Sequence, residues 1–259
     1  MRFSILTLFP EMFTNILGSS ILKRAAQRGF IETHLVQIRD FAPDKHQRTD
    51  DASFGGGPGM VMKADVLDRA LQHVRAQQEG RVILLTPQGG RFEQADARRL
   101  AGCPHLILVC GHYEGVDERF AEHAVDEELS LGDFVLTGGE LPAMVVLDAV
   151  ARLLPGVLGD AESAGTDSFG AGMFDHPHYT RPAVWHPLAG GERRVPAILL
   201  AGDHGAVAAW RRRQAMLRTL IRRPELLQRV AWSKQERRVI EALANDLEAM
   251  EHDLERDEQ

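Results

Sequence analysis

The sequence of 259 residues contains only two cysteines and no long apolar run. Cys103 and Cys110 cannot build a disulfide framework, and their spacing matches no metal-binding motif. Because stable disulfides belong to oxidising compartments, this scarcity fits a reducing cytoplasm. No apolar run approaches the roughly 20 residues that cross a bilayer, and the short apolar stretch at the N-terminus is interrupted by Pro10 and has no signal-peptide cleavage site. We expect a cytoplasmic globular protein with no membrane partner.

Negative charge exceeds positive charge in the whole chain, but positive charge is concentrated in one segment. The formal net charge is −7, which by itself argues against a nucleic-acid partner, since phosphate neutralisation dominates such binding. Residues 210–238 nevertheless carry ten arginines and lysines, opposed only by Glu225 and Glu236, whereas the last fourteen residues are acidic. Because the distribution of charge matters more than its sum, this segment can still bind a polyanion.

Alternating strand-like and helix-like segments in the first 160 or so residues predict a parallel α/β sheet. Apolar runs at 3–9, 34–38, 82–85 and 106–110 are typical of buried strands, and residues 12–22 and 65–74 have helical spacing. Ligands of such sheets bind beyond the carboxyl ends of the strands. Residues 160–172 are rich in Gly, Ala and Ser, and a helical pattern with a capping box at Ser233 and Glu236 follows. We predict domains at 1–160 and 177–259, joined by a flexible linker at 161–176.

Five segments combine glycine, proline or histidine with polar side chains: FGGGPGM (54–60), LLTPQGG (84–90), CGHYEGVDER (110–119), LGDFVLTGGELP (131–142), and TDSF (166–169) followed by DHPHYTRP (175–182). Each alone fits tight turns or a mobile loop as well as a binding site. Tyr113 and Glu114 between two glycines are more typical of recognition than of packing. His176 and His178 suggest a metal, but we identify no ligand set around them and predict no metal site.

Taken in order, nine segments closely resemble bacterial tRNA (guanine-N1-)-methyltransferases, a branch of the knotted SPOUT methyltransferase superfamily. They are FGGGPGM, LLTPQG, CGHYEGVDER, LGDFVLTGGELPAMV, RLLPGVLG, DSF, HPHYTRP, VPAILLAGDH and WRRRQ…RT…RRPELL, and they span residues 1 to about 230. The resemblance implies a parallel α/β domain with a C-terminal trefoil knot, followed by a small all-helical domain. It also implies an obligate homodimer whose active sites lie across the interface.

The same resemblance implies a reaction. S-adenosylmethionine donates a methyl group to N1 of the guanosine immediately 3′ of the anticodon in tRNA. Asp167 is the expected general base, and Arg152 is expected to stabilise charge on the guanine. Magnesium is also implied, but no carboxylate cluster in the sequence identifies its site.

Binding residues follow from the resemblance as well. S-adenosylmethionine is expected to contact Leu84, Leu85, Thr86, Pro87, Gln88, Gly111, Tyr113, Glu114, Leu131, Gly132, Phe134, Val135, Leu136, Gly138, Gly139 and Pro142. Glu114 is also expected to bind the guanine edge, and the anticodon stem-loop is expected to contact Arg211, Arg212, Arg213, Arg218, Arg222 and Arg223.

Two alternatives stay open beside this assignment: a knotted methyltransferase that acts on another RNA nucleotide, and a non-catalytic RNA-binding relative. The pairing of Asp167 and Arg152 with a basic C-terminal domain argues against the first, and the intact base and cofactor loop argue against the second. The sequence departs from the family at His112, where arginine is expected more often. The stretch 183–194 and the acidic tail have no assigned role.

Overall fold

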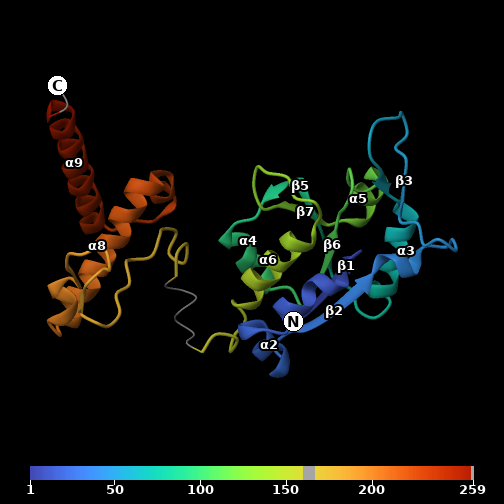
Figure 1. Ribbon diagram of the computed structural model, residues 1–259, viewed down its shortest axis with the longest axis horizontal. Helices are drawn as coiled ribbons and strands as arrows, with labels where there is room; N and C mark the ends of the chain where they lie inside the picture. Colours follow the sequence, from blue (N-terminus) through green and yellow to red (C-terminus); the bar gives the residue numbers. More distant parts are fainter. Residues whose placement is uncertain (160–166, 258–259) are drawn as a thin grey trace. The chain divides into compact units, whose positions relative to one another are not determined.

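The computed structural model describes residues 1–159 and 167–257, and the chain divides into two compact units, Met1–Ala161 and Glu162–Gln259 (Figure 1). Residues 161–166 of the predicted linker lie outside the described residues. The rest of that linker, 167–176, belongs to the second unit. Its Met173 side chain is buried in the core of that unit, and the Phe174 amide donates to the Thr219 hydroxyl at 2.9 Å.

A five-stranded sheet forms the centre of the first unit. Its strands are β1 (Arg2–Thr7), β2 (Glu32–Gln37), β5 (Arg81–Arg91), β6 (His105–Cys110) and β7 (Glu127–Ser130). They are ordered β2-β1-β6-β5-β7, and every neighbouring pair is parallel. The predicted parallel α/β sheet is confirmed.

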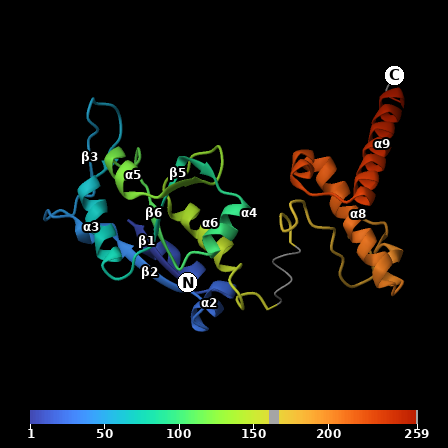
Figure 2. The same ribbon diagram turned by 180° about the vertical axis from the view of Figure 1, so that it is seen from behind.

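Alternate residues of these strands pack into two separate hydrophobic cores, one on each face of the sheet, as expected for a pleated sheet covered on both faces. On β6, Leu106 and Leu108 face one core, whereas Ile107 and Val109 face the other. Helices α2 (Ser20–Gln27), α4 (Gln94–Ala101) and α6 (Glu140–Ala151) cover the first face. Helices α3 (Ala64–Arg75) and α5 (Glu118–Ala124) cover the second face (Figures 1 and 2).

Two predicted elements differ from the structure in extent. The single helix expected at 12–22 is broken into a 3-10 turn, η1 (Pro10–Phe13), a short helix, α1 (Thr14–Leu17), and α2. The interruption falls at Ser20, whose φ of 48° is incompatible with a continuous right-handed helix. Strand β5 runs six residues beyond the predicted end at Leu85, because its pairing with β7 resumes at Gly90 after a register shift.

Short elements connect these layers. A 3-10 turn, η2 (Ile38–Phe41), follows β2, and a small antiparallel hairpin of β3 (Asp50–Asp51) and β4 (Val61–Met62) carries the FGGGPGM segment. Four glycines of that segment have positive φ angles: Gly55, Gly56, Gly57 and Gly59. The glycine run therefore serves a backbone path that other residues would adopt only with strain.

Helix α8 (His204–Arg222), the 3-10 segment η4 (Pro224–Arg229) and α9 (Lys234–Asp257) form most of the second unit. Their core includes Met216, Leu227 and Leu243, and the Trp232 indole donates to the Leu227 carbonyl at 2.8 Å. The predicted capping box is confirmed. The Ser233 amide donates to the Glu236 carboxylate at 2.9 Å, and the Glu236 amide donates to the Ser233 hydroxyl at 3.2 Å.

The second unit is not all-helical, contrary to expectation. Before the 3-10 segment η3 (Ala197–Leu200), strands β8 (Val184–Trp185) and β9 (Arg193–Arg194) form an antiparallel ribbon. Gly190 and Gly191, with φ angles of 89° and 84°, lie in the connection between the two strands. The stretch 183–194, whose role the sequence left open, is this ribbon. Among the described residues, no helix has both the length and the apolar character needed to cross a membrane.

Candidate functional site

A pocket of about 440 Å³ lies at the carboxyl ends of β5, β6 and β7, where a parallel sheet holds its ligands. The sixteen residues expected to bind S-adenosylmethionine come together here, because all of them except Gly132 line this pocket. Gly132 lies in the same loop, where a side chain would lie 3.0 Å from the Phe134 ring. Its glycine shapes the loop without lining the pocket.

Along one wall of the pocket, the backbone of residues 110–112 contacts the backbone of residues 138–139. The Gly139 amide donates to the Gly111 carbonyl at 2.9 Å, and His112 and Gly138 form an isolated antiparallel bridge. A Cβ atom at residue 139 would lie 2.6 Å from the Cys110 Cα. Backbone atoms cannot yield as side-chain ends do, so this crossing requires glycine at position 139.

A buried carboxylate also stabilises this wall of the pocket. Glu140 is only 1% exposed, and its Oε1 accepts a hydrogen bond from the Thr7 hydroxyl at 2.6 Å. Its Oε2 lies 2.6 Å from Nε2 of His112. Because an unpaired buried carboxylate is costly, the three side chains stabilise one another and hold the ends of β1 and β6 to the start of α6.

Burial, followed by the charge of Glu140, raises the pKa of Cys110 well above its ordinary value. The thiol therefore stays protonated and packs as a small apolar group, which excludes it as a nucleophile at neutral pH.

The turn that carries Tyr113 and Glu114 projects into the pocket. Tyr113 has a φ of 61° and a half-exposed side chain, and the Glu114 amide donates to the Met60 carbonyl at 3.0 Å. A Cβ atom at Gly59 would overlap the Glu114 carboxyl group. The FGGGPGM segment therefore supports the position of Glu114, a role that the sequence pattern did not reveal.

Sequence reasoning missed several pocket residues. Glu118 and Glu128 add carboxylates to its lining, and His112 lines it while contacting the unpredicted pair Thr7 and Glu140. The departure from the family at His112 was the one available signal. Thr7 gave none, because it meets Glu140 from 133 residues away in sequence.

Within the first unit, the predicted catalytic residue Arg152 does not line the pocket. Pro142 lines the pocket in the first turn of α6, and Arg152 caps the other end of the helix. At 1.5 Å per residue these two positions are about 15 Å apart along the helix axis. Asp167 belongs to the second unit and begins a turn in which its carbonyl accepts from the Gly170 amide at 2.8 Å.

Five of the six predicted tRNA-binding arginines, all except Arg213, fall into two groups. Arg212 pairs with Glu236 at 2.7 Å and lies 5.4 Å from the centre of the Trp232 ring, and Arg223 pairs with Glu225. Hydrogen bonds from Ser233, followed by those from Arg212, lower the pKa of Glu236 to about 2. Arg211, Arg218 and Arg222 follow one another at intervals of seven and four residues, so they share a face of α8.

Comparison with known proteins identifies the family. The family model described as "tRNA (Guanine-1)-methyltransferase TrmD" matches residues 1–229. The chain belongs to this family. A relative from Magnetococcus marinus named tRNA (guanine-N(1)-)-methyltransferase is 61% identical over 252 residues, which cover 97% of this chain and 99% of the relative.

Two further relatives carry the same name. The protein of Chloroflexus aggregans is 59% identical over 89% of both chains, and that of Desulforudis audaxviator is 51% identical over 96% of this chain and 99% of its own. The similarity therefore extends through both units.

The backbone crossing gives a direct test of the pocket wall. We predict that Gly139→Ala lowers the free energy of unfolding by about 1–3 kcal/mol, because the new methyl group overlaps backbone atoms of Cys110 and Gly111. Urea unfolding followed by far-UV circular dichroism measures this. Gly90→Ala is the matched control, since its Cβ would meet only the Glu128 carbonyl at 3.9 Å. Equal stability of the two variants would contradict the crossing as described.

Proposed function

We propose that this chain transfers the methyl group of S-adenosylmethionine to N1 of the guanosine immediately 3′ of the anticodon in tRNA. The observation that carries the proposal is the convergence of fifteen of the sixteen expected cofactor residues on one pocket of about 440 Å³. That volume suits a ligand of nucleoside size. The names of the three relatives support guanine N1 as the methylated atom.

S-adenosylmethionine would bind through both backbone and apolar side chains. Backbone amides and carbonyls of 138–139 would contact the adenosine without needing side chains. Phe134, Val135 and Leu136, which are 55%, 82% and 36% exposed, would cover the ligand's apolar surface. Glu118 and Glu128 line the same pocket and would favour the positive sulfonium.

The reaction needs a base, because guanine N1 carries a proton and is a poor nucleophile until that proton is removed. The Asp167 carboxylate would take that proton as N1 forms a bond to the methyl carbon. The methyl–sulfur bond breaks, its electron pair stays on sulfur, and a neutral thioether is released. Arg152 would stabilise the negative charge that develops on the guanine, and Glu114 would bind its polar edge.

The position of Arg152 supports a homodimeric enzyme. This residue lies about 15 Å along α6 from the pocket-lining Pro142. A second copy of the chain would supply Arg152 and Asp167 to this pocket and receive the same residues in return, as a two-fold interface does. The close passage of 138–139 past 110–111 also supports the trefoil knot proposed from the family resemblance.

The tRNA would bind to the basic face of α8. Arg211, Arg218 and Arg222 offer cations along one helix face that can contact phosphates of the anticodon stem-loop. Arg212 and Arg223 are held by Glu236 and Glu225, so we assign them to the fold of the unit. The target guanosine would be flipped out of its stack into the pocket. A tRNA substrate also favours the cytoplasmic location that we propose.

Magnesium enters no step of this mechanism. Among the side chains that the structure describes, in 1–159 and 167–245, the one group of three closely spaced potential metal ligands is Asp175, His176 and His178. Magnesium prefers oxygen ligands, and two of these three are imidazoles. The residues described at the pocket therefore do not form a dedicated magnesium site.

Replacing the proposed base separates catalysis from binding. We predict that Asp167→Asn lowers kcat for methyl transfer to tRNA by about 10²–10⁴-fold, because an amide cannot take the N1 proton. Calorimetric titration should show unchanged affinity for S-adenosylmethionine. Asp203→Asn, which keeps a good N-cap on α8, is the matched control and should retain full activity. An active Asp167→Asn enzyme would contradict the assigned role.

The basic face of α8 predicts a change in salt dependence. We expect Arg211→Ala to weaken tRNA binding and to reduce the slope of log affinity against log salt by about 1, because one phosphate contact is lost. Filter binding across a range of salt concentrations measures both effects. Arg24→Ala, which removes an exposed arginine from α2, is the control. An unchanged slope for Arg211→Ala would exclude this arginine from the interface.

A further inference from the structure

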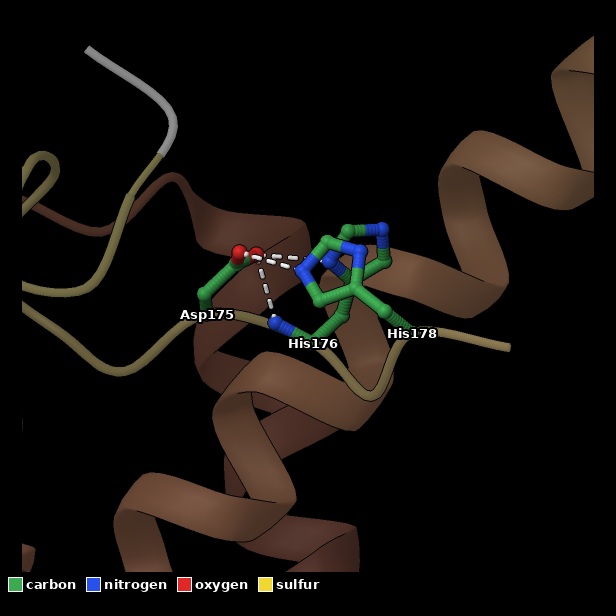
Figure 3. A group of neighbouring side chains, drawn as sticks. All are labelled: Asp175, His176 and His178. Atoms are coloured by element: carbon green, nitrogen blue, oxygen red, sulfur yellow. Dashed lines mark hydrogen bonds and ion pairs between the residues drawn. The ribbon is translucent and has the colours of Figure 1, made fainter. Parts of the chain in front are cut away.

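Three potential metal ligands gather at the start of the HPHYTRP segment, outside the pocket described above (Figure 3). Nδ1 of His176 lies 2.6 Å from Oδ1 of Asp175, and Nε2 of His178 lies 2.7 Å from Oδ2 of the same carboxylate. The centres of the two imidazole rings are 4.4 Å apart. One carboxylate is thus flanked by two imidazole nitrogens, and Asp175 completes a ligand set that the sequence analysis overlooked.

The backbone that leads into this cluster is fixed by contacts within the second unit. The Phe174 amide donates to the Thr219 hydroxyl, and Thr219 is itself buried within α8. The Asp175 amide donates to the Ser168 hydroxyl at 3.0 Å, and Met173 is part of the core. Pro177 separates the two histidines and restricts the chain between them. The three side chains therefore start from anchored positions, which lowers the entropic cost of holding a common ligand.

The donor set selects a class of cation. Two imidazoles with one carboxylate match the three-ligand sites of Zn²⁺ that keep a fourth position open, whereas Mg²⁺ and Ca²⁺ prefer oxygen ligands. Tetrahedral Zn²⁺ with bonds of about 2.0–2.1 Å needs ligand atoms roughly 3.3 Å apart. The observed separations of 2.6 and 2.7 Å are a fraction of an ångström shorter. The His178 side chain is 71% exposed, so it can make most of that adjustment.

We propose that Asp175, His176 and His178 form a binding site for one divalent transition-metal ion, with Zn²⁺ the best match. The ion takes the place of the hydrogen bonds between the carboxylate and the imidazoles, and each ring binds in its neutral form, with its single proton on the nitrogen that does not bind the metal. A pocket of about 560 Å³, lined by His176, His178, Tyr179 and Arg211 among others, lies beside the cluster. It gives the open fourth position access to water or to an anionic ligand.

Metal binding would also stiffen the turn that carries Asp167. The Asp175 amide is hydrogen-bonded to Ser168, the neighbour of Asp167, and the Phe169 amide donates to the Met173 carbonyl at 2.7 Å. A cation bound to Asp175 would therefore restrict the motion of residues 168–169 as well as that of residues 173–175. This consequence, unlike the metal site itself, rests on the proposed role of Asp167 as the base.

Zinc titration of the chelator-treated, full-length protein tests the site without any tRNA or S-adenosylmethionine. Competition against a chromophoric chelator should give one Zn²⁺ per chain, and Co²⁺ should bind with the visible absorption of a tetrahedral site. His176→Ala and His178→Ala should each weaken Zn²⁺ binding by about tenfold or more. The matched control is His186→Ala, which removes an exposed histidine from the β8–β9 ribbon and should leave the affinity unchanged.

Folding of each variant is checked by fluorescence, since all three tryptophans, Trp185, Trp210 and Trp232, lie in the second unit. Zinc affinity that is undiminished in a folded His176→Ala/His178→Ala double variant would overturn the proposal, as would a native protein that binds no Zn²⁺. Asp167→Asn should bind Zn²⁺ normally. A failure of the methyl-transfer assignment would therefore leave this result intact, and the two proposals fail separately.

Discussion

The contact between the Gly139 amide and the Gly111 carbonyl is the constraint on which the pocket depends. It brings the loop before α6 against the end of β6 so closely that no side chain fits at residue 139. Glu140, the next residue, then lies between Thr7 and His112 and fixes the same crossing through buried hydrogen bonds. These contacts hold one end of the loop, whose apolar residues Phe134, Val135 and Leu136 line the pocket.

The length of α6 separates Arg152 from the pocket-lining Pro142. Helix α6 begins at the pocket, and Arg152 caps its other end, about 15 Å away along the helix axis. The proposed homodimer would account for this distance, because a second copy could present its Arg152 and Asp167 to each pocket. Methyl donor and catalytic groups would then come from different chains, and the rate would depend on assembly.

The sequence predicted the features that arise from local pattern. Apolar runs located the strands, and the shared carboxyl edge of a parallel sheet explains why segments around Leu84, Gly111 and Gly138 meet. Contacts between distant residues left no local pattern. Glu140 with Thr7 and Arg212 with Glu236 were therefore missed, and so was the break at Ser20. The grouping of Asp175 with His176 and His178 was missed too, because the sequence does not show that both imidazoles turn towards the same carboxylate.

Methyl transfer from labelled S-adenosylmethionine to unmodified tRNA transcripts tests the central claim most directly. Two transcripts should be compared that differ only at the position 3′ of the anticodon, one with guanosine and one with adenosine. The proposed function predicts label in the guanosine transcript alone, located at N1 of that base. Equal labelling of both transcripts, or label on another nucleotide, would contradict it.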